Sequence, residues 1–403
     1  LAALEPNDDP RRSLSVLALK SEAIARVILD GLGREKTGAL LSALVNQYRG
    51  RHFHAADLYQ IAADHDIELE PLVGDWLHDS SLPGFLVSSV ESVRLTDDSQ
   101  GNPRYQTRLH VRNDESTPGL VRFSFQWGSK KKWIWDATEP IRVPANSSVE
   151  VGISTLTPLG ELWLKPYLSL NRHDVKLRVP KVDSEARLNT EILVGARPSD
   201  WKPRKTADIV VDDLDSGFSV RSEREGEAIS IEISIGSPFS DEVADMDQGL
   251  PEYKSIYGTA EAWSRSVYED SWGKYRHTHA LVTSGAGDQH AAFSTELPHE
   301  GRWRLSYYLA LSPEQKAKKG EEAEGAATGR LTASVLGEYQ MNLISNGDNQ
   351  KIEFDGKAAA SGWNDLGEFQ LPAGEISLEV SNANTGFIVI ADAIRWRPST
   401  LGK

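Results

Sequence analysis

The spacing of apolar residues changes at Phe85, and this change constrains the fold more than any other feature of the sequence. Over residues 13–79 apolar residues recur every three or four positions, as on one face of a helix, with Gly31 as a stop for the first helix. Beyond Phe85 they alternate with polar residues, as over 87–95 and 105–111, which is the pattern of half-buried strands. The sequence therefore predicts a mixed, mainly β protein with a short N-terminal helical lobe followed by two β-sandwich domains.

Turn residues and changes of composition predict the domain boundaries. We expect a helical segment over 1–84 and a first β-sandwich over 85–180. Residues 181–207 carry prolines and charges without periodicity, which indicates a linker. A second sandwich is expected over 208–403, with a polar surface loop at 314–329 that is poor in apolar residues.

Composition and charge narrow the function classes. The chain has 403 residues and a net charge of -15, which opposes nucleic-acid binding because phosphates require a basic surface. It has no cysteine, which excludes disulfides, Cys-ligated zinc and thiol catalysis. No run approaches the ~18 apolar residues of a membrane helix, and no signal peptide is recognisable. Since the sequence begins at Leu1 and enters directly into a helical pattern, we expect a fragment of a longer polypeptide.

Residues 54–85 predict a helix, an acidic break, a short second helix and a sharp exit at Pro83. This order resembles the end of the catalytic domain in the aminopeptidase-N-like zinc metallopeptidases, the gluzincins. The positions that carry the resemblance are Asp75, Trp76, Leu77 and Pro83. Residues 164–177 are also similar to the last strand of the β-domain that follows the peptidase domain in some bacterial members.

The zinc site of that family is absent from the sequence. No His-Glu-x-x-His motif occurs, and this route of hydrolysis needs both histidines and the glutamate base. We therefore expect no catalytic residue and no cofactor in this chain, which should be inactive alone. The resemblance implies that zinc belongs to a missing N-terminal catalytic portion of the same polypeptide, which would be the partner of this chain.

The C-terminal sequence carries a second resemblance. A strand containing Gly362, Trp363 and Gly367 is followed by a Pro-Ala-Gly turn and by a final Ala-Asp-Ala-Ile-Arg strand that contains Asp392. This succession resembles the golvesin-type, carbohydrate-binding-module-like domain. The resemblance implies a jelly-roll-like β-sandwich over 208–403 of the kind attached to secreted or envelope hydrolases. It places the protein outside the cytoplasm, in the periplasm or cell envelope of a bacterium.

The motif residues of this domain have structural explanations. Gly362 and Gly367 permit tight turns or bulges, and Trp363 can share one face with Phe369. Asp392 is flanked by alanines in an apolar strand, so it must be hydrogen-bonded if it is buried. We expect it to tie down a neighbouring turn, with a ligand role as the alternative.

Aromatic residues are dense between positions 263 and 303, and an exposed ring is the usual platform for a pyranose. Trp272 and Tyr275 are the candidate glycan-binding residues, because Gly273 and Lys274 between them indicate an exposed turn. Most other rings of this region are expected in the core: Trp263, Tyr268 and Trp303. The ligand would be a glycan or a peptide.

Three groups of residues were weighed as metal sites, and a solvated surface is favoured for each. They are His52, His54 and His65; His277, His279 and His290; and the acidic segment 241–247. The first group spans about three helical turns, too far to share an ion, and no carboxylate completes the second. The third lacks the spacing of an EF-hand loop. We predict no metal site from them, with a structural Ca²⁺ elsewhere in the sandwich as an alternative.

One basic run has interleaved aromatics: Lys130, Lys131 and Lys132 precede Trp133 and Trp135. The negative net charge makes nucleic-acid recognition there improbable. A turn of solvated lysines, or a contact with the missing catalytic portion, is the favoured interpretation.

Two functions from different classes remain. The first is the non-catalytic C-terminal portion of a bacterial zinc aminopeptidase-like protein, giving structural support and substrate or surface binding. The second is a free-standing glycan-binding or adhesion protein with no peptidase parent. The first hypothesis predicts a large exposed apolar patch on the helices, since they would have lost their covering partner. The second predicts a self-sufficient helical domain.

Overall fold

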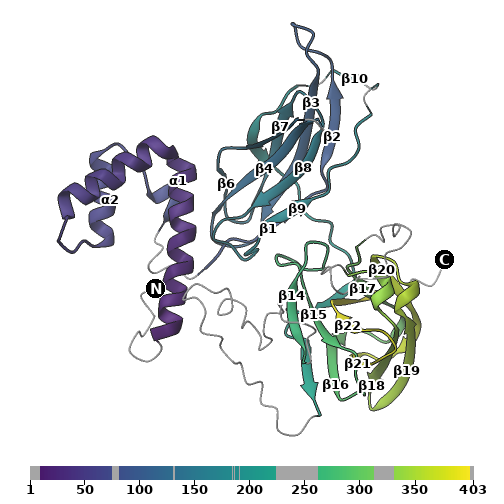
Figure 1. Cartoon of the computed structure of the whole chain (residues 1–403). Helices are drawn as coiled ribbons and strands as arrows, with labels where there is room; N and C mark the ends of the chain where they lie inside the picture. The colour runs from purple at the N-terminus through teal and green to yellow at the C-terminus, as the bar shows by residue number, and fades with distance from the viewer. Residues whose placement is uncertain are drawn as a thin grey trace, which may run out of the picture. The chain divides into compact units, whose positions relative to one another are not determined.

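The computed structural model divides the chain into two compact units, residues 1–204 and 205–403. It describes residues 10–74, 81–129, 132–183, 185, 187–189, 191–223, 262–312 and 331–399, without the side chains of residues 11, 12, 15 and 19. Figure 1 shows a helical lobe in the first unit and packed strands in both. The predicted class, mainly β with a short helical lobe and two sandwiches, is confirmed.

The described residues of the lobe form three helices: α1 (Pro10–Tyr48), α2 (Ala55–Asp64) and α3 (Glu70–Val73). α1 is broken at Gly33, whose φ of 74° and ψ of 170° suit glycine and strain other residues. The stop expected at Gly31 is therefore wrong by two positions, because Gly31 stays helical and Gly33 makes the break. A small apolar core joins the helices and consists of Leu40, Ile61, Ala62, Ile67 and Leu69.

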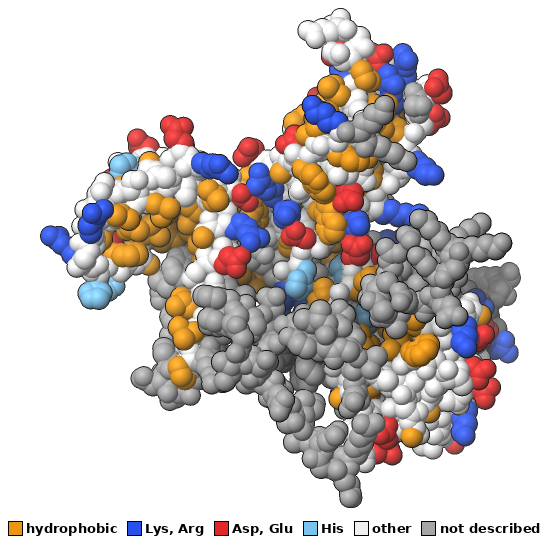
Figure 2. All heavy atoms as spheres, in the orientation of Figure 1, with side chains coloured by type: hydrophobic (Ala, Val, Ile, Leu, Met, Phe, Trp, Pro, Cys, Tyr) orange, Lys and Arg blue, Asp and Glu red, His pale blue; other side chains and the backbone are white. Residues whose placement is uncertain are grey.

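Large apolar side chains remain exposed on the lobe, where Figure 2 shows orange atoms gathered at the left. They are Leu14, Leu17, Leu29, Leu41, Val45 and Phe53, with exposed fractions from 43% to 65%. Exposure of several such side chains on one small lobe is typical of a surface that meets another apolar surface. The acid-Trp-Leu sequence at 75–77 lies outside the described residues.

The first sandwich packs two sheets around one core. One sheet has the order β10-β2-β3-β7-β11 with β1 paired to β3, and the other has the order β5-β4-β8-β9 with β6 paired to β4. Leu109 and Val151 from the first sheet meet Phe123 and Leu164 from the second in that core. The strands are β1 (Phe85–Val87), β2 (Glu91–Leu95), β3 (Arg104–Asn113), β4 (Gly119–Ser129), β5 (Lys132–Ala137), β6 (Ile141–Val143), β7 (Ser147–Thr155), β8 (Leu159–Lys165), β9 (Val175–Leu177), β10 (Arg187–Leu188) and β11 (Gly195–Ser199).

The segment 181–207, expected as a linker, instead contributes two strands to this sandwich. β11 pairs antiparallel with β7, and β10 pairs parallel with β2. The side chain of Gln106 holds the connection between them, since it donates to the carbonyl of Leu193 at 2.9 Å and accepts from its N–H at 2.8 Å. Proline and charge are tolerated in edge strands as well as in linkers, so composition did not separate the two.

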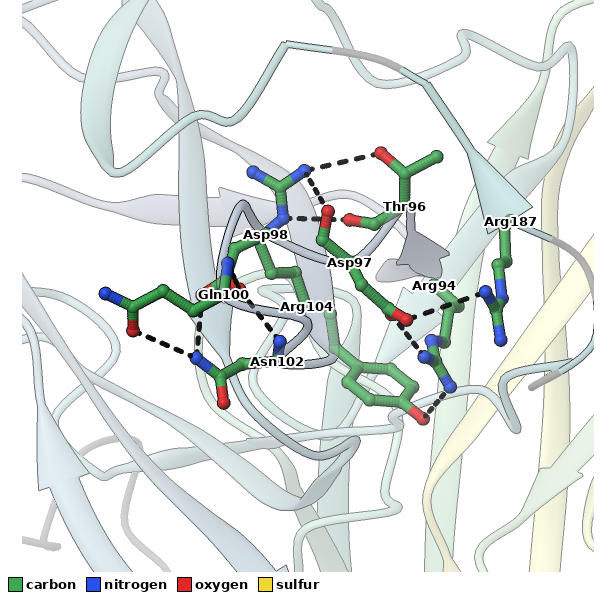
Figure 3. A network of polar contacts seen from close by, with 9 residues as sticks. Arg94, Thr96, Asp97, Asp98, Gln100, Asn102, Arg104 and Arg187 are labelled. Carbon is green, nitrogen blue, oxygen red and sulfur yellow. Dashed lines mark hydrogen bonds and ion pairs between the residues drawn. The ribbon is translucent and has the colours of Figure 1, made fainter.

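A polar network closes the turn between β2 and β3 (Figure 3). Asp98 accepts hydrogen bonds from the backbone N–H and the side-chain amide of Asn102 at 2.8 and 3.0 Å. Asp97 accepts from Arg94 at 2.5 Å, and Arg187 of β10 approaches its second oxygen at 3.5 Å. These contacts satisfy the polar groups of the turn and fasten β10 to it, so we assign them a structural role.

The described residues of the second unit form three sheets in the orders β12-β23-β17-β20, β13-β16-β21-β18-β19 and β14-β15-β22. Aromatic and aliphatic side chains fill its core, including the fully buried Trp303, Trp396 and Phe293. The strands are β12 (Ile209–Asp212), β13 (Phe218–Ser222), β14 (Ser264–Val267), β15 (Thr278–Thr283), β16 (Gln289–Leu297), β17 (Gly301–Leu309), β18 (Glu338–Ser345), β19 (Asp348–Asp355), β20 (Gly362–Leu371), β21 (Gly374–Asn384), β22 (Ile388–Ala391) and β23 (Ala393–Pro398).

Because the two sandwiches have separate cores, a cavity in one should leave the unfolding of the other unchanged. Leu109→Ala in the first and Leu378→Ala in the second remove buried side chains. Each should lower the free energy of unfolding of its own unit by about 2–5 kcal/mol. Denaturant titration with peptide-level hydrogen exchange assigns each transition to its residues. One transition shifted equally by both variants would contradict the division into two units.

Candidate functional site

The sheet β12-β23-β17-β20 has one face in the core and one face outside it. On β17 the side chains of Trp303, Leu305, Tyr307 and Leu309 are buried, so Tyr308 lies on the opposite, outer face. The register places Trp363 of β20 opposite Tyr308, and Arg395 of β23 opposite Ser306. Paired residues share a face of a sheet, so the outer face collects side chains from three strands.

Three rings on this face contact one another, and we call Trp272, Tyr308 and Trp363 the aromatic cluster. The ring centroids of Trp272 and Trp363 are 4.9 Å apart, those of Tyr308 and Trp363 are 5.0 Å apart, and those of Trp272 and Tyr308 are 5.6 Å apart. All three side chains are half-buried. The guanidinium carbon of Arg395 lies 4.4 Å from the Trp363 ring centroid, in cation–π geometry.

Trp272 reaches the cluster from the loop between β14 and β15, and hydrogen bonds hold that loop. Its backbone N–H donates to Oδ1 of Asp392 at 3.0 Å, and Asp392 is fully buried. The hydroxyl of Tyr308 donates to the carbonyl oxygen of Asp270 at 2.9 Å. The side chains of Asp392 and Tyr308 therefore hold the backbone of the loop that carries the Trp272 ring.

Charged groups are buried behind this loop. Asp213 accepts from Nε of Arg265 at 2.7 Å and from the Thr278 hydroxyl at 2.8 Å, and its N–H donates to the carbonyl oxygen of Asp392 at 3.0 Å. The side chains of Arg265 and Asp213 have no exposed surface, so removing either would leave an uncompensated buried charge. These bonds join β12, β14, β15 and the junction between β22 and β23 at one point.

Burial raises the pKa of two carboxyl groups beside this ion pair. It raises the pKa of Asp212 to about 9, with repulsion from Asp213 and Asp215 adding to the effect. It also raises the pKa of Asp392 well above its usual value, with Asp212 and Asp213 contributing. Among the described residues no group hydrogen-bonds Oδ1 of Asp212 or Oδ2 of Asp392, so neither oxygen has a donor that would stabilise a buried carboxylate.

Ion pairs border the aromatic cluster on the outer face. Arg397 binds Asp208 through two nitrogens at 2.7 and 2.9 Å, and Arg304 binds Glu368 at 3.2 Å. Nε of Arg395 lies 3.9 Å from Asp208, which is a looser contact. The face therefore offers rings beside hydrogen-bonding groups, which is the composition of a site for a polar ligand with apolar faces.

Of the two predicted glycan-binding residues, Trp272 belongs to the aromatic cluster and Tyr275 does not. Nζ of Lys274 lies 4.6 Å from the Tyr275 ring centroid. Gly273 makes the intervening turn possible, because a Cβ at this position would overlap the carbonyl oxygen of Arg276. Trp263 and Trp303 are in the core, and Tyr268 is half-buried with its hydroxyl 2.5 Å from that of Ser312.

The four residues of the C-terminal sequence motif, which are Gly362, Trp363, Gly367 and Asp392, each have a local structural role. Gly362 begins β20 at a φ of 100°, and Gly367 has a φ of 118° beside the β-bulge between β17 and β20. Asp392 bonds the backbone of Trp272, and Trp363 stands at the centre of the aromatic cluster. Sequence reasoning missed Tyr308 and Arg395, whose only signal was their position in two alternating strands.

The structure places the histidines that were weighed as metal ligands. Across the described residues no group of three or more His, Cys, Asp or Glu side chains could hold an ion. His279, expected on a solvated strand, is fully buried, and burial lowers its pKa to about 4. His54 and His65 lie at the two ends of α2. The acidic segment 241–247 lies outside the described residues. A structural calcium ion elsewhere in the sandwich stays a prediction.

No protein-family profile and no curated protein matches the chain. Solved structures that are similar to it include carbohydrate-binding modules. A Podospora anserina GH26-CBM35 β-(1,4)-mannanase is 17% identical over 36% of this chain, with a TM-score of 0.23, and the match spans 28% of the mannanase. TmCBM61 in complex with β-1,4-galactotriose is 12% identical over 35% of this chain and 92% of its own, with a TM-score of 0.19.

A tandem CBM22 domain from Paenibacillus barcinonensis Xyn10C is 10% identical over 78% of this chain and 94% of its own, with a TM-score of 0.23. Matches at these scores define neither a family nor a ligand, and they give no support to a zinc aminopeptidase parent. Within the described part of the chain, no helix has the length and apolar character needed to cross a membrane.

The raised pKa values predict a pH-dependent second unit. The folded state holds protons that the unfolded state releases near pH 4, so this stability is fully present below about pH 4 and is lost as the pH rises towards the folded pKa values. Asp392→Asn removes the titrating carboxyl and keeps an oxygen that can accept from the Trp272 N–H, so it should flatten the fall in unfolding free energy as the pH rises above about 4.

Urea titrations of wild type and variant at several pH values measure this effect. The exposed Asp348→Asn on β19 is the matched control and should leave the pH dependence unchanged. A second unit that becomes more stable from pH 6 to pH 9 in the wild type would contradict the raised pKa values of the buried acids.

Proposed function

We propose that the second unit is a carbohydrate-binding module and that the aromatic cluster is its binding site. The observation that carries this proposal is a set of three contacting rings on the outer face of a sheet, held from behind by Asp392 and flanked by Arg395. A pyranose presents apolar C–H faces and a rim of hydroxyl groups, so a site for it needs rings beside hydrogen-bonding side chains.

The ring geometry favours a particular shape of ligand. The planes of Trp272, Tyr308 and Trp363 are inclined to one another by 59° to 74°. Inclined rings form a concave site and not a flat one. Such a site suits the end or a bend of a soluble polysaccharide chain more than the flat surface of a crystalline polysaccharide. Arg395, together with Asp365 on the adjoining row, supplies donors and acceptors for hydroxyl groups.

The parent of the chain and its location remain part of the same proposal. The exposed apolar side chains of the helical lobe agree with a covering partner, as the first hypothesis requires. A zinc aminopeptidase as that partner rests on the sequence resemblance alone. We retain an extracytoplasmic location as a proposal, because a glycan-binding module acts where polysaccharides are.

Affinity electrophoresis of the full chain in gels containing galactomannan, xylan, hydroxyethyl cellulose or arabinogalactan tests the binding site. Each stacked base in the analogous nucleic-acid case contributes about 1–3 kcal/mol, so Trp363→Ala and Trp272→Ala should each weaken binding by about tenfold. Phe387→Ala, which removes a ring that is 65% exposed on the same unit, is the control and should bind as the wild type does.

Two results would overturn the proposal. One is that every polysaccharide that retards the wild type retards Trp363→Ala and Trp272→Ala to the same extent. The other is no retardation of the wild type by any of the four, which would make a peptide ligand or a structural role the better explanation.

A further inference from the structure

The first sandwich carries a separate aromatic surface on the sheet β5-β4-β8-β9. On β4 the side chains of Phe123 and Phe125 point into the core, so those of Ser124 and Gln126 point outward. The register places Trp135 of β5 and Glu161 of β8 on either side of Gln126, and Trp163 of β8 beside Ser124. Since paired residues share a face, these side chains all lie on the outer surface of the sheet.

Contacts join these side chains into one surface. Nε1 of Trp163 donates to Oε2 of Glu161 at 3.1 Å, and Nζ of Lys176 lies 5.1 Å from the Trp163 ring centroid. A Cβ placed on Gly160 would meet Oε1 of Gln126 and the ring of Trp133, each at 3.1 Å. Gly160 thus leaves room for both. We call this surface the tryptophan face: Trp133, Trp135, Trp163, Gln126, Glu161 and Lys176.

Two of the three rings of this face are unusually exposed for tryptophan. Trp135 is 54% exposed and Trp133 is 42% exposed, and no other tryptophan in the described parts of the chain is classed as exposed. The inward side chains of β4 and β8 already fill the core, so folding does not require these rings. At the far end of the same face Arg122 pairs with Asp30 of α1 at 2.7 Å, whereas the tryptophan end stays open.

We propose that the tryptophan face binds an uncharged oligosaccharide chain. The rings offer stacking surfaces for sugar C–H faces, and Gln126 and Glu161 between them offer an amide and a carboxylate to hydroxyl groups. From strand spacing and rise, Trp135 and Trp163 lie about 12 Å apart, which suits several linked sugars better than one.

Charge and polarity select this ligand over others. Glu161 and Lys176 are the charged members of the tryptophan face and carry opposite signs, so its six residues have no net charge. Polar side chains separate Trp135 from Trp163, and this interrupted pattern is unlike the continuous apolar centre of a stable protein–protein interface. The site lies in a different unit from the aromatic cluster, so it does not depend on the function proposed for the latter.

The test uses the full chain and the same four polysaccharides, with variants in each unit. Trp135→Ala/Trp163→Ala should raise the dissociation constant of the bound polysaccharide by at least about tenfold. Trp135→Phe should retain most of the affinity, because a stacking ring is kept. Leu156→Ala removes a side chain that is 49% exposed elsewhere on the same sandwich, and it should bind as the wild type does.

The outcomes separate this site from the aromatic cluster. Loss in Trp135→Ala/Trp163→Ala with unchanged binding by Trp363→Ala supports the tryptophan face and overturns the cluster as a site. Wild-type affinity in Trp135→Ala/Trp163→Ala overturns the tryptophan face, whatever Trp363→Ala does. A second overturning result would be a molar mass by light scattering that falls to half the wild-type value in this variant while binding stays unchanged. The exposed rings of β5 would then serve to pair two copies of the chain. No binding of any polysaccharide by the wild type overturns both sites.

Discussion

The buried ion pair of Asp213 and Arg265 is the interaction on which the second unit and its aromatic cluster depend. Both side chains are without exposed surface, and Asp213 is also bonded to Thr278 and to the backbone of Asp392. Asp392 in turn holds the backbone of Trp272. A charge buried this deeply is stable only with its partners in place, so the pair ties β12, β14, β15 and the junction between β22 and β23 together. Through Asp392 it also fixes the position of one ring of the site.

In the first sandwich, neutral amide groups hold the buried ends of loops and strands. Asn171 donates to the carbonyl of Phe85 and accepts from its N–H, both at 2.9 Å, and Asn113 donates to the carbonyl of Thr117 at 2.7 Å. These amides are as deeply buried as Asp392, but they do not titrate. The two sandwiches therefore differ in how pH acts on them, although each closes its loops with buried polar side chains.

The two outer faces differ in how their rings are supported. In the aromatic cluster the rings of Trp272, Tyr308 and Trp363 lean on one another, and buried hydrogen bonds fix the loop of Trp272. On the tryptophan face the rings are spaced by polar residues and rest on the sheet itself, with Gly160 providing the room. Support from regular strands requires no buried charge. This explains why the tryptophan face needs no buried ion pair or buried carboxyl group of the kind that holds the aromatic cluster.

Local pattern was enough to predict the class of the fold, the helical lobe and the turn that carries Trp272, because apolar period and turn residues act over a few positions. Local pattern failed at 181–207, where a strand and a linker share one composition, and at His279, whose burial depends on the sheet around it. Tyr308, Trp363 and Arg395 meet only through the register of β17, β20 and β23. The sequence by itself determined which residues alternate; the tertiary structure decided which of them share a face, because strand pairing joins segments far apart in the chain and no local preference encodes that choice.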